Sequence, residues 1–218
     1  MASQPHIPTR GERNTQKIFG AVRLDTAQFI RRHKEVLWAT DFFTAEVWTP
    51  TGLTTFYVLF FLHLQARRIV LAGITPFPNE AWLKQVARNL TVDDGPMTHT
   101  RYLLHDRDAK FSEDFDDVFQ SAGIEPLKLP PRSPNLNAFA ERWVRSVKDE
   151  CLDQLILFGE RSLHHALKEY LSHFLHERNH QGLENVIPFP HQPTDRREGT
   201  VHKSERLGGL LNFYQRAA

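Results

Sequence analysis

Three apolar stretches between residues 36 and 75 follow one another with only short turns between them, and they constrain the fold more than any other feature. They are VLWATDFFTAEVW (Val36 to Trp48), the stretch from Thr54 to Leu64, and RRIVLAGIT (Arg67 to Thr75). Their aromatic and β-branched residues are typical of strands. Parallel neighbours would need long crossovers, so the short turns predict an antiparallel meander. The first strand is apolar on both faces, which places it centrally in a covered sheet.

Helices and short strands alternate in the next part of the chain. A helix is expected from Glu80 to Leu90, a short strand at Tyr102–Leu104, a helix from Ser112 to Ala122 and a strand from Ile124 to Leu129. This alternation predicts parallel neighbours. A long helix is expected from Ser162 to about Arg178. The predicted fold is therefore α/β, a five-stranded mixed sheet (a three-strand antiparallel meander plus two parallel strands) flanked by helices.

The composition excludes several classes of protein. With 218 residues, 40% of them hydrophobic, the chain can bury the core of one domain. A net charge of +1 excludes a histone-like polycation, and the single cysteine, Cys151, cannot form an internal disulfide. The N-terminus lacks an apolar signal core, and Phe56–Leu64 is too short to span a bilayer. We expect a cytoplasmic protein with no membrane partner.

Three segments are expected along the chain. Residues 1–32 form a flexible N-terminal lead-in, with a short helix near its end, and residues 33–182 form the core domain. Residues 183–218 form a C-terminal loop and a docking tail, in which RLGGLLNFY is a candidate short strand.

Three acidic residues occupy positions where a carboxylate calls for an explanation. Asp41 lies in the middle of the central strand, where an unpaired buried carboxylate is costly. Asp106 stands at the carboxyl end of the fourth strand, and Glu141 opens the helix after the fifth. If strands one and four are adjacent, the three acids converge and repel one another unless divalent cations neutralise them. Oxygen-only ligands favour Mg²⁺ or Mn²⁺ over zinc, and two such ions would suit phosphodiester chemistry.

The helix that carries Glu141 begins within SPNLNAFAERWVRSVKDE (Ser133 to Glu150), with Asn137 as a plausible N-cap. Its apolar residues recur at four-residue spacing and predict one buried face: Phe139, Trp143 and Val147. Arg145 and Lys148 share the Glu141 side. Two interpretations stay open, a solvated face with an intrahelical Glu–Arg pair, or a carboxylate for metal beside two cations for phosphate.

The motifs around these acids carry a family resemblance. Asp41 in WATDFFTAEVW, Asp106 in LLHDRDAKF and Glu141 in SPNLNAFAERWVRSVKDECLD resemble the Asp, Asp, Glu triad of the retroviral-type integrase core found in bacterial insertion-sequence transposases. The likeness continues through YVLFFLHLQARRIVLAGIT and HERNHQGL into RLGGLLNFY, so it covers most of residues 25–218. It implies a ribonuclease H-like fold and Mg²⁺-dependent (or Mn²⁺-dependent) cleavage and joining of DNA strands. It also implies transposon ends and target DNA as partners, and an assembly of identical subunits.

The sequence departs from this family pattern in three respects. Glu141 follows Asp106 by 35 positions (141 − 106 = 35), one short of the commonest spacing. Asn179 stands where many relatives have proline. No helix-turn-helix or zinc-binding module precedes the core. Two alternatives stay open: a plain metal-dependent nuclease on the same fold, or a non-catalytic DNA-binding or multimerising fragment of a decayed transposase.

Five basic residues flank the expected site and are candidates for contacts to DNA backbone phosphates: Arg142, Arg145, Lys148, Lys110 and Arg132. Such contacts position DNA but read no sequence. Asp108 is expected to cap the following loop or helix, because the family pattern places the catalytic acid first in the Asp-Arg pair. The acids of the 112–122 helix, among them Asp116, are expected on a solvated face.

Three histidines have helix-like spacing: His173, His176 and His180. A zinc site would need a fourth ligand and a closed shell, and no CxxC motif accompanies them. We therefore expect surface or phosphate-facing histidines at these positions.

Overall fold

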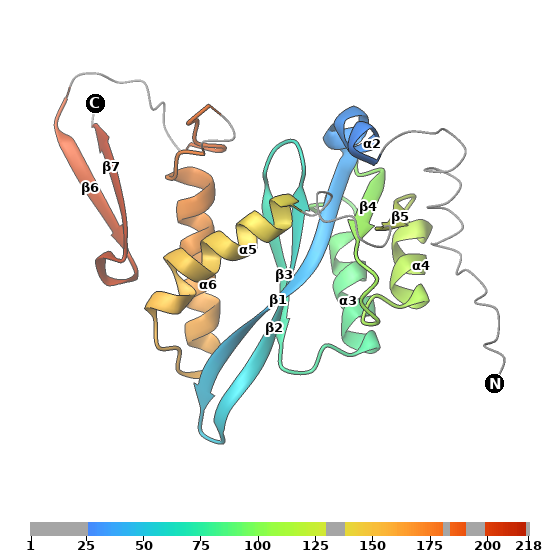
Figure 1. Ribbon diagram of the computed structural model, residues 1–218, viewed down its shortest axis with the longest axis horizontal. Helices are drawn as coiled ribbons and strands as arrows, with labels where there is room; N and C mark the ends of the chain where they lie inside the picture. The colour runs from blue at the N-terminus through green and yellow to red at the C-terminus, as the bar shows by residue number, and fades with distance from the viewer. Residues whose placement is uncertain (1–25, 130–137, 181–183, 191–198, 217–218) are drawn as a thin grey trace.

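The computed structural model describes residues 26–129, 138–180, 184–190 and 199–216, and its centre is a five-stranded sheet in the order β3-β2-β1-β4-β5 (Figure 1). The strands are β1 (Leu37–Thr49), β2 (Gly52–His63), β3 (Ile69–Thr75), β4 (Tyr102–His105) and β5 (Glu125–Lys128). β2 is antiparallel to both β1 and β3, whereas β4 is parallel to β1 and β5 to β4. The predicted mixed sheet is confirmed, and its first strand is the central one.

Helices pack on both faces of the sheet, and the alternation of side chains along β1 assigns the two cores. Leu37, Ala39 and Phe43 pack with α5 and α6, and we name this side the α5/α6 face. Trp38 packs with α3 and α4 on the opposite side, the α3/α4 face. The helices are α2 (Thr26–His33), α3 (Glu80–Leu90), α4 (Glu113–Ser121), α5 (Ala138–Glu150) and α6 (Gly159–His176), with short 3₁₀ turns η1 (Lys34–Val36), η3 (Leu152–Gln154) and η5 (Leu207–Gly209).

Side-chain caps determine where α3 and α4 begin. The backbone N–H of Trp82 donates to the Asn79 side chain at 2.9 Å, and that of Phe115 donates to the Ser112 hydroxyl at 3.4 Å. Gly123, with φ of +78°, follows the end of α4, where a left-handed residue stops a helix at little cost. These local signals are visible in the sequence, so the predicted boundaries of both helices are close to the observed ones.

Helix α6 begins three residues earlier than predicted. It starts at Gly159, whose φ of +71° suits the sharp entry from the preceding loop. Ser162 was expected to start the helix, but its hydroxyl donates to the Gly159 carbonyl at 2.9 Å inside the first turn. The predicted start was wrong because a hydroxyl that bonds backward to a carbonyl looks like a cap in the sequence.

The C-terminal region contains a hairpin where one short strand or tail was expected. Strand β6 (Val201–Arg206) pairs antiparallel with β7 (Leu211–Arg216) as a separate two-stranded sheet. The apolar part of RLGGLLNFY forms most of β7, with Leu211 buried against the α5/α6 core. β6 escaped prediction because its sequence, VHKSER, is polar and almost wholly exposed.

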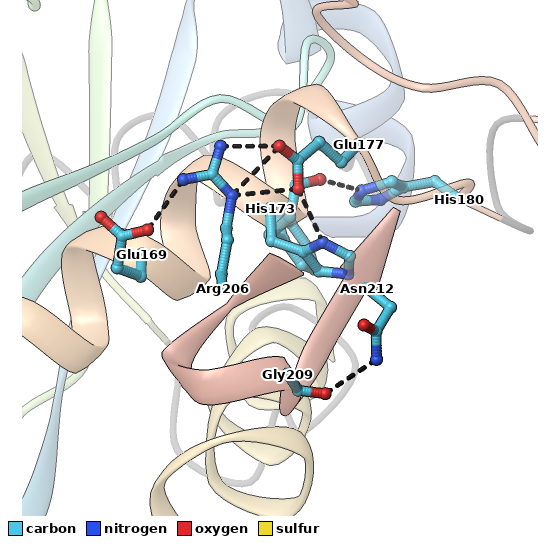
Figure 2. A network of polar contacts seen from close by, with 8 residues as sticks. Glu169, His173, Glu177, His180, Arg206, Gly209 and Asn212 are labelled. Carbon is cyan, nitrogen blue, oxygen red and sulfur yellow. Dashed lines mark hydrogen bonds and ion pairs between the residues drawn. The ribbon is translucent and has the colours of Figure 1, made fainter. Parts of the chain in front are cut away.

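Arg206 connects this hairpin to α6 (Figure 2). Its guanidinium donates to both carboxylate oxygens of Glu177 at 2.6–3.0 Å and to Glu169 at 2.8 Å. Burial opposes the charge on Glu177, but hydrogen bonds from Arg206 and from His173 hold the pKa of this carboxyl below its ordinary value. The Glu177 hydrogen bond likewise raises the pKa of Arg206. A two-stranded hairpin is barely stable alone, so this ion-pair network and Leu211 hold it in place.

Two observations bear on the expectations from composition. Cys151 is fully buried, and burial raises the pKa of its thiol to about 11, which makes it an unreactive core residue. Among the described residues, no helix combines the length and apolar character needed to cross a bilayer.

Candidate active site

The register between β1 and β4 brings Asp41 and Asp106 to the same level of the sheet. The parallel ladder runs from Leu37 opposite Tyr102 to Ala39 opposite Leu104, an offset of 65 positions (102 − 37 = 65). Asp41 and Asp106 keep that offset (106 − 41 = 65), two residues beyond the last pair. Both continue the alternation of the residues that face α5 and α6. Continued past the end of β4, this register assigns both aspartates to the α5/α6 face of neighbouring strands.

Backbone N–H groups hold one oxygen of each aspartate. Asp41 Oδ1 accepts from the N–H of Phe42 at 2.8 Å, and Asp106 Oδ1 accepts from the N–H of Asp108 at 2.9 Å. Both aspartates are half-buried, at the point where β4 ends and its backbone turns away. One oxygen of each carboxylate therefore has a defined orientation, and neither side chain is fully buried.

A buried polar group lies behind Asp106, on the α3/α4 face. His105 Nδ1 is 2.8 Å from the Asp106 carbonyl oxygen, and its Nε2 is 3.0 Å from Asp116 Oδ1. Lys128 Nζ is 3.4 Å from the other Asp116 oxygen. These distances allow ion pairing, although the His105–Asp116 contact is not aligned as a hydrogen bond. The group ties β4, α4 and β5 together directly behind the loop that carries Asp106.

The expectation for Asp116 was wrong. It was placed on a solvated helix face, but it is only 3% exposed. Its neighbours in sequence are acidic and polar, and nothing in that run distinguishes the one acid that turns inward. A signal was available in the helical stripe, because Asp116 lies between the buried residues Phe115 and Phe119 on α4.

Glu141 lies in the first turn of α5 and is exposed. Within the described part of the chain it has no hydrogen bond or ion pair, so the intrahelical pair with Arg145 does not form. Nor do the described residues contain any group of three or more His, Cys, Asp or Glu side chains placed to hold a metal ion. The register thus puts Asp41 and Asp106 at one level of the sheet, and Glu141 lies in the first turn of α5.

The residues predicted to contact phosphate do not lie together on one surface. Arg145 is exposed and Lys148 half-exposed on the Glu141 side of α5, whereas Arg142 lies near the ring of Phe139, 5.9 Å from its centroid. Lys110 is on the α3/α4 face, 5.4 Å and 5.7 Å from the ring centroids of Tyr57 and Phe42. Arg132, like the expected cap Asn137, lies outside the described residues.

Lys110 also pairs with Asp108. The ammonium lies 2.7 Å from Asp108 Oδ2, and the Lys110 N–H donates to Oδ1 at 3.0 Å. Burial raises the pKa of Asp108, but these hydrogen bonds and the lysine charge outweigh it and hold the pKa below its ordinary value. Asp108 therefore caps the loop after β4, as the sequence predicted.

The three spaced histidines each bond within the fold. His173 Nδ1 lies 3.0 Å from Glu177, His176 Nδ1 is 2.6 Å from the Phe189 carbonyl, and His180 Nε2 is 2.7 Å from the Phe174 carbonyl. They are partly buried and hold the end of α6 against the segments that follow it, which differs from the surface positions expected for them.

The comparisons with known proteins identify this architecture. A family model described as an integrase core domain matches residues 122–188, and no curated protein matches. The catalytic core domain of BIV integrase is 16% identical with a TM-score of 0.51, over 71% of this chain and 91% of that one. A chain of the simian T-cell lymphotropic virus intasome, solved in complex with PP2A regulatory subunit B56 gamma, is 14% identical with a TM-score of 0.50. The match covers 84% of this chain and 67% of that one. The chain has the fold of an integrase-type catalytic core.

The ribonuclease H-like fold implied by the sequence motifs is thereby confirmed. In this integrase-type core the matched family stretch contains α5 with Glu141, while Asp41 and Asp106 precede it. The roles of the three acids and five cations remain predictions. The sequence alone did not single out Arg67, which lies in the β2–β3 turn and reaches α5, because a contact between positions so far apart has no local pattern.

Proposed function

We propose that this integrase-type core is a metal-dependent polynucleotidyl transferase that cleaves and joins DNA strands at transposon ends. The observation that supports it best is the shared register of Asp41 and Asp106 on the face that packs α5. Two carboxylates at one level of adjacent parallel strands, at the carboxyl end of β4, are placed to share a cation. The proposal takes residues 33–182 as the catalytic domain and the bacterial cytoplasm as its location.

The residues fit Mg²⁺ or Mn²⁺ in their chemistry. The donor set consists of carboxylate oxygens, which hard divalent cations prefer. Within the described residues, the second oxygen of Asp106 has no hydrogen-bond partner and remains for a ligand. Glu141 would complete the set from α5, and a bound pair of ions would stabilise charge at the attacking and leaving oxygens.

The chain's own residues bind and orient the substrate in this scheme. In the first step water attacks the phosphorus at the transposon end, the P–O3′ bond breaks, and a free 3′-OH is released. In the second step that 3′-OH attacks a phosphodiester of the target, forming a new P–O bond and displacing the target's own 3′ oxygen. No side chain becomes covalently linked to DNA. Arg145 and Lys148 would hold backbone phosphates beside Glu141, with Lys110, Arg142 and Arg132 as further candidates.

An assay of strand cleavage and joining, with matched variants, tests this function. Labelled DNA carrying transposon-end sequences is incubated with the protein and Mg²⁺, and both nicked and joined products are measured. Asp106→Asn is expected to lose about a thousandfold or more in cleavage, the several kcal/mol that metal-held charge stabilisation contributes. Asp108→Asn removes an equal charge two residues away and is expected to retain activity. Equal activity of wild type and Asp106→Asn would contradict the proposal.

Two outcomes would favour the alternatives. Cleavage without joined products, even from pre-cleaved ends, would indicate a plain nuclease. A non-catalytic DNA-binding protein has one observation in its favour, since the described residues do not bring three acids together. That alternative predicts DNA binding without Mg²⁺-dependent nicking.

A further inference from the structure

A second polar region lies on the other side of α5 from Glu141. It is a pocket of about 460 Å³ between the β2–β3 turn, α5 and the end of α6. Its wall contains three arginines with aromatic rings and a histidine: Arg67, Phe139, Arg142, Trp143, Arg178 and His180. The α5 residues that line it are three or four positions apart and so share a helical side, whereas Glu141, Arg145 and Lys148 share another.

The positive charge of this pocket is not balanced. Arg178 pairs with Glu150 at 2.7 Å, but neither Arg67 nor Arg142 has a carboxylate partner among the described residues. Arg67 Nη1 is buried and has no acceptor in this part of the chain. Burial, and then the charge of Arg142, lower the pKa of Arg67 to about 10. A partly buried cation without a carboxylate partner is costly, so this arrangement favours binding of an anion.

Two of the pocket's arginines, Arg67 and Arg178, pack against aromatic rings. The Arg67 guanidinium lies 3.3 Å from the centroid of Phe139, and that of Arg178 lies 5.5 Å from Phe174. A guanidinium stacked on a ring keeps its N–H donors at the edge. Trp143 Nε1 is a further buried donor without an acceptor among the described residues. Polar groups of the wall are thus mainly donors, and small side-chain rotations can turn them toward a bound group.

Arg67 also occupies its turn at a conformational cost. Its φ of +58° is left-handed, a region in which glycine or asparagine is less strained than arginine. The backbone of the turn therefore gives no reason for arginine at this position. Its contacts with Phe139 and the pocket do.

We infer that this pocket binds a phosphoryl group, held by Arg67 and Arg142 with Arg178 beside them. Donors from the β2–β3 turn and from α5 suit the several oxygens of a phosphate better than the two of a carboxylate. The group could belong to the backbone of a DNA strand or to a free nucleotide, since the pocket has room for more than the phosphate. This site goes beyond the proposed function, because it needs neither the acids nor a metal.

Calorimetric titration of the full chain in EDTA tests the site without any contribution from divalent cations. The probes are inorganic phosphate, deoxyadenosine 5′-monophosphate and an oligothymidine strand. Arg67→Gln and Arg142→Gln are each expected to weaken binding roughly tenfold or more, as for a lost hydrogen bond between charged groups. Arg88→Gln, at an exposed position of α3 on the opposite face of the sheet, is the matched control and should bind as wild type does.

The three probes distinguish the source of the phosphate. If only the oligonucleotide binds, and its binding depends on Arg67 and Arg142, the site is assigned to DNA backbone. If phosphate or the nucleotide binds with the same dependence, the site is assigned to a small ligand. Without ligand, Arg67→Gln should unfold at the same temperature as wild type or higher, because it removes a partly buried charge that has no carboxylate partner among the described residues. No binding of any probe, or equal binding by wild type and both variants, would overturn the inference. Cleavage is measured separately, so a failure here leaves the proposed function standing.

Discussion

Helix α5 separates two polar regions of opposite character. In the proposed function the carboxylates of Asp41, Asp106 and Glu141 would offer acceptors to a cation, and strand register and the start of a helix set their positions. On the other side Arg67 and Arg142 offer donors to an anion, and they meet only because a turn and a helix pack together. The two proposals together imply that one helix supports two sites whose chemistry is independent. Changes on one side should leave the other intact.

Loss of the buried centre of α5 should have the largest effect, because it disturbs both sides at once. Trp143 is 2% exposed and contacts the rings of Phe60, Tyr170 and Phe174. Trp143→Ala is expected to reduce the free energy of unfolding by about 3–5 kcal/mol. Urea unfolding followed by circular dichroism measures it. Trp48→Ala, at a half-exposed position near the end of β1, should cost less than about 1 kcal/mol, and equal losses would show that α5 is not the shared support.

Removing the cations on the acid side should have an intermediate effect on DNA binding. The double variant Arg145→Gln, Lys148→Gln is expected to bind DNA with a shallower dependence on salt. The slope of log K against log salt concentration should fall in magnitude by about 2, since each phosphate contact contributes about 0.9. Fluorescence anisotropy over a range of salt concentrations gives the slope. Free phosphate binding in the arginine pocket should not change in this variant. A slope equal to that of wild type would remove both residues from the DNA interface.

The smallest effect expected is a pH dependence of stability that comes from His180, which lines the arginine pocket. Burial lowers the pKa of His180, and the charges of Arg178 and Arg67 lower it further, although the Phe174 carbonyl and Glu150 oppose them. Its folded pKa lies below the unfolded value near 6.5, so its contribution to stability is present above pH 6.5 and is lost as the pH falls through the folded pKa.

The free energy of unfolding, measured above and below about pH 6.5, tests whether the contribution of His180 is lost at acidic pH. His180→Gln should lose less stability on acidification than wild type does. The exposed His99→Gln should behave as wild type. An unchanged acid dependence in His180→Gln would show that His180 is not responsible.

The comparison also shows what the sequence alone could predict. The mixed sheet whose strands β1 and β4 lead to Asp41 and Asp106 was predictable because short turns and helix–strand alternation determine which strands are antiparallel and which are parallel. Strand β6 was missed because its stability comes from Arg206 and Glu177, which lie 29 positions apart, and not from an apolar pattern. Arg67 was missed for a similar reason, since nothing near it in sequence indicates that α5 covers it. Local patterns predict elements, whereas contacts between distant polar groups need the packed structure.

Binding of Mn²⁺ to the folded protein tests the central claim, that Asp41 and Asp106 together form the metal site, most directly. Free Mn²⁺ can be quantified by electron paramagnetic resonance during titration, without any requirement for DNA or turnover. We expect wild type to bind Mn²⁺ tightly, Asp41→Asn and Asp106→Asn each to abolish that binding, Glu141→Gln to weaken it, and Asp108→Asn to leave it unchanged. Wild-type Mn²⁺ affinity in folded Asp106→Asn, or an equal loss in Asp108→Asn, would contradict this account.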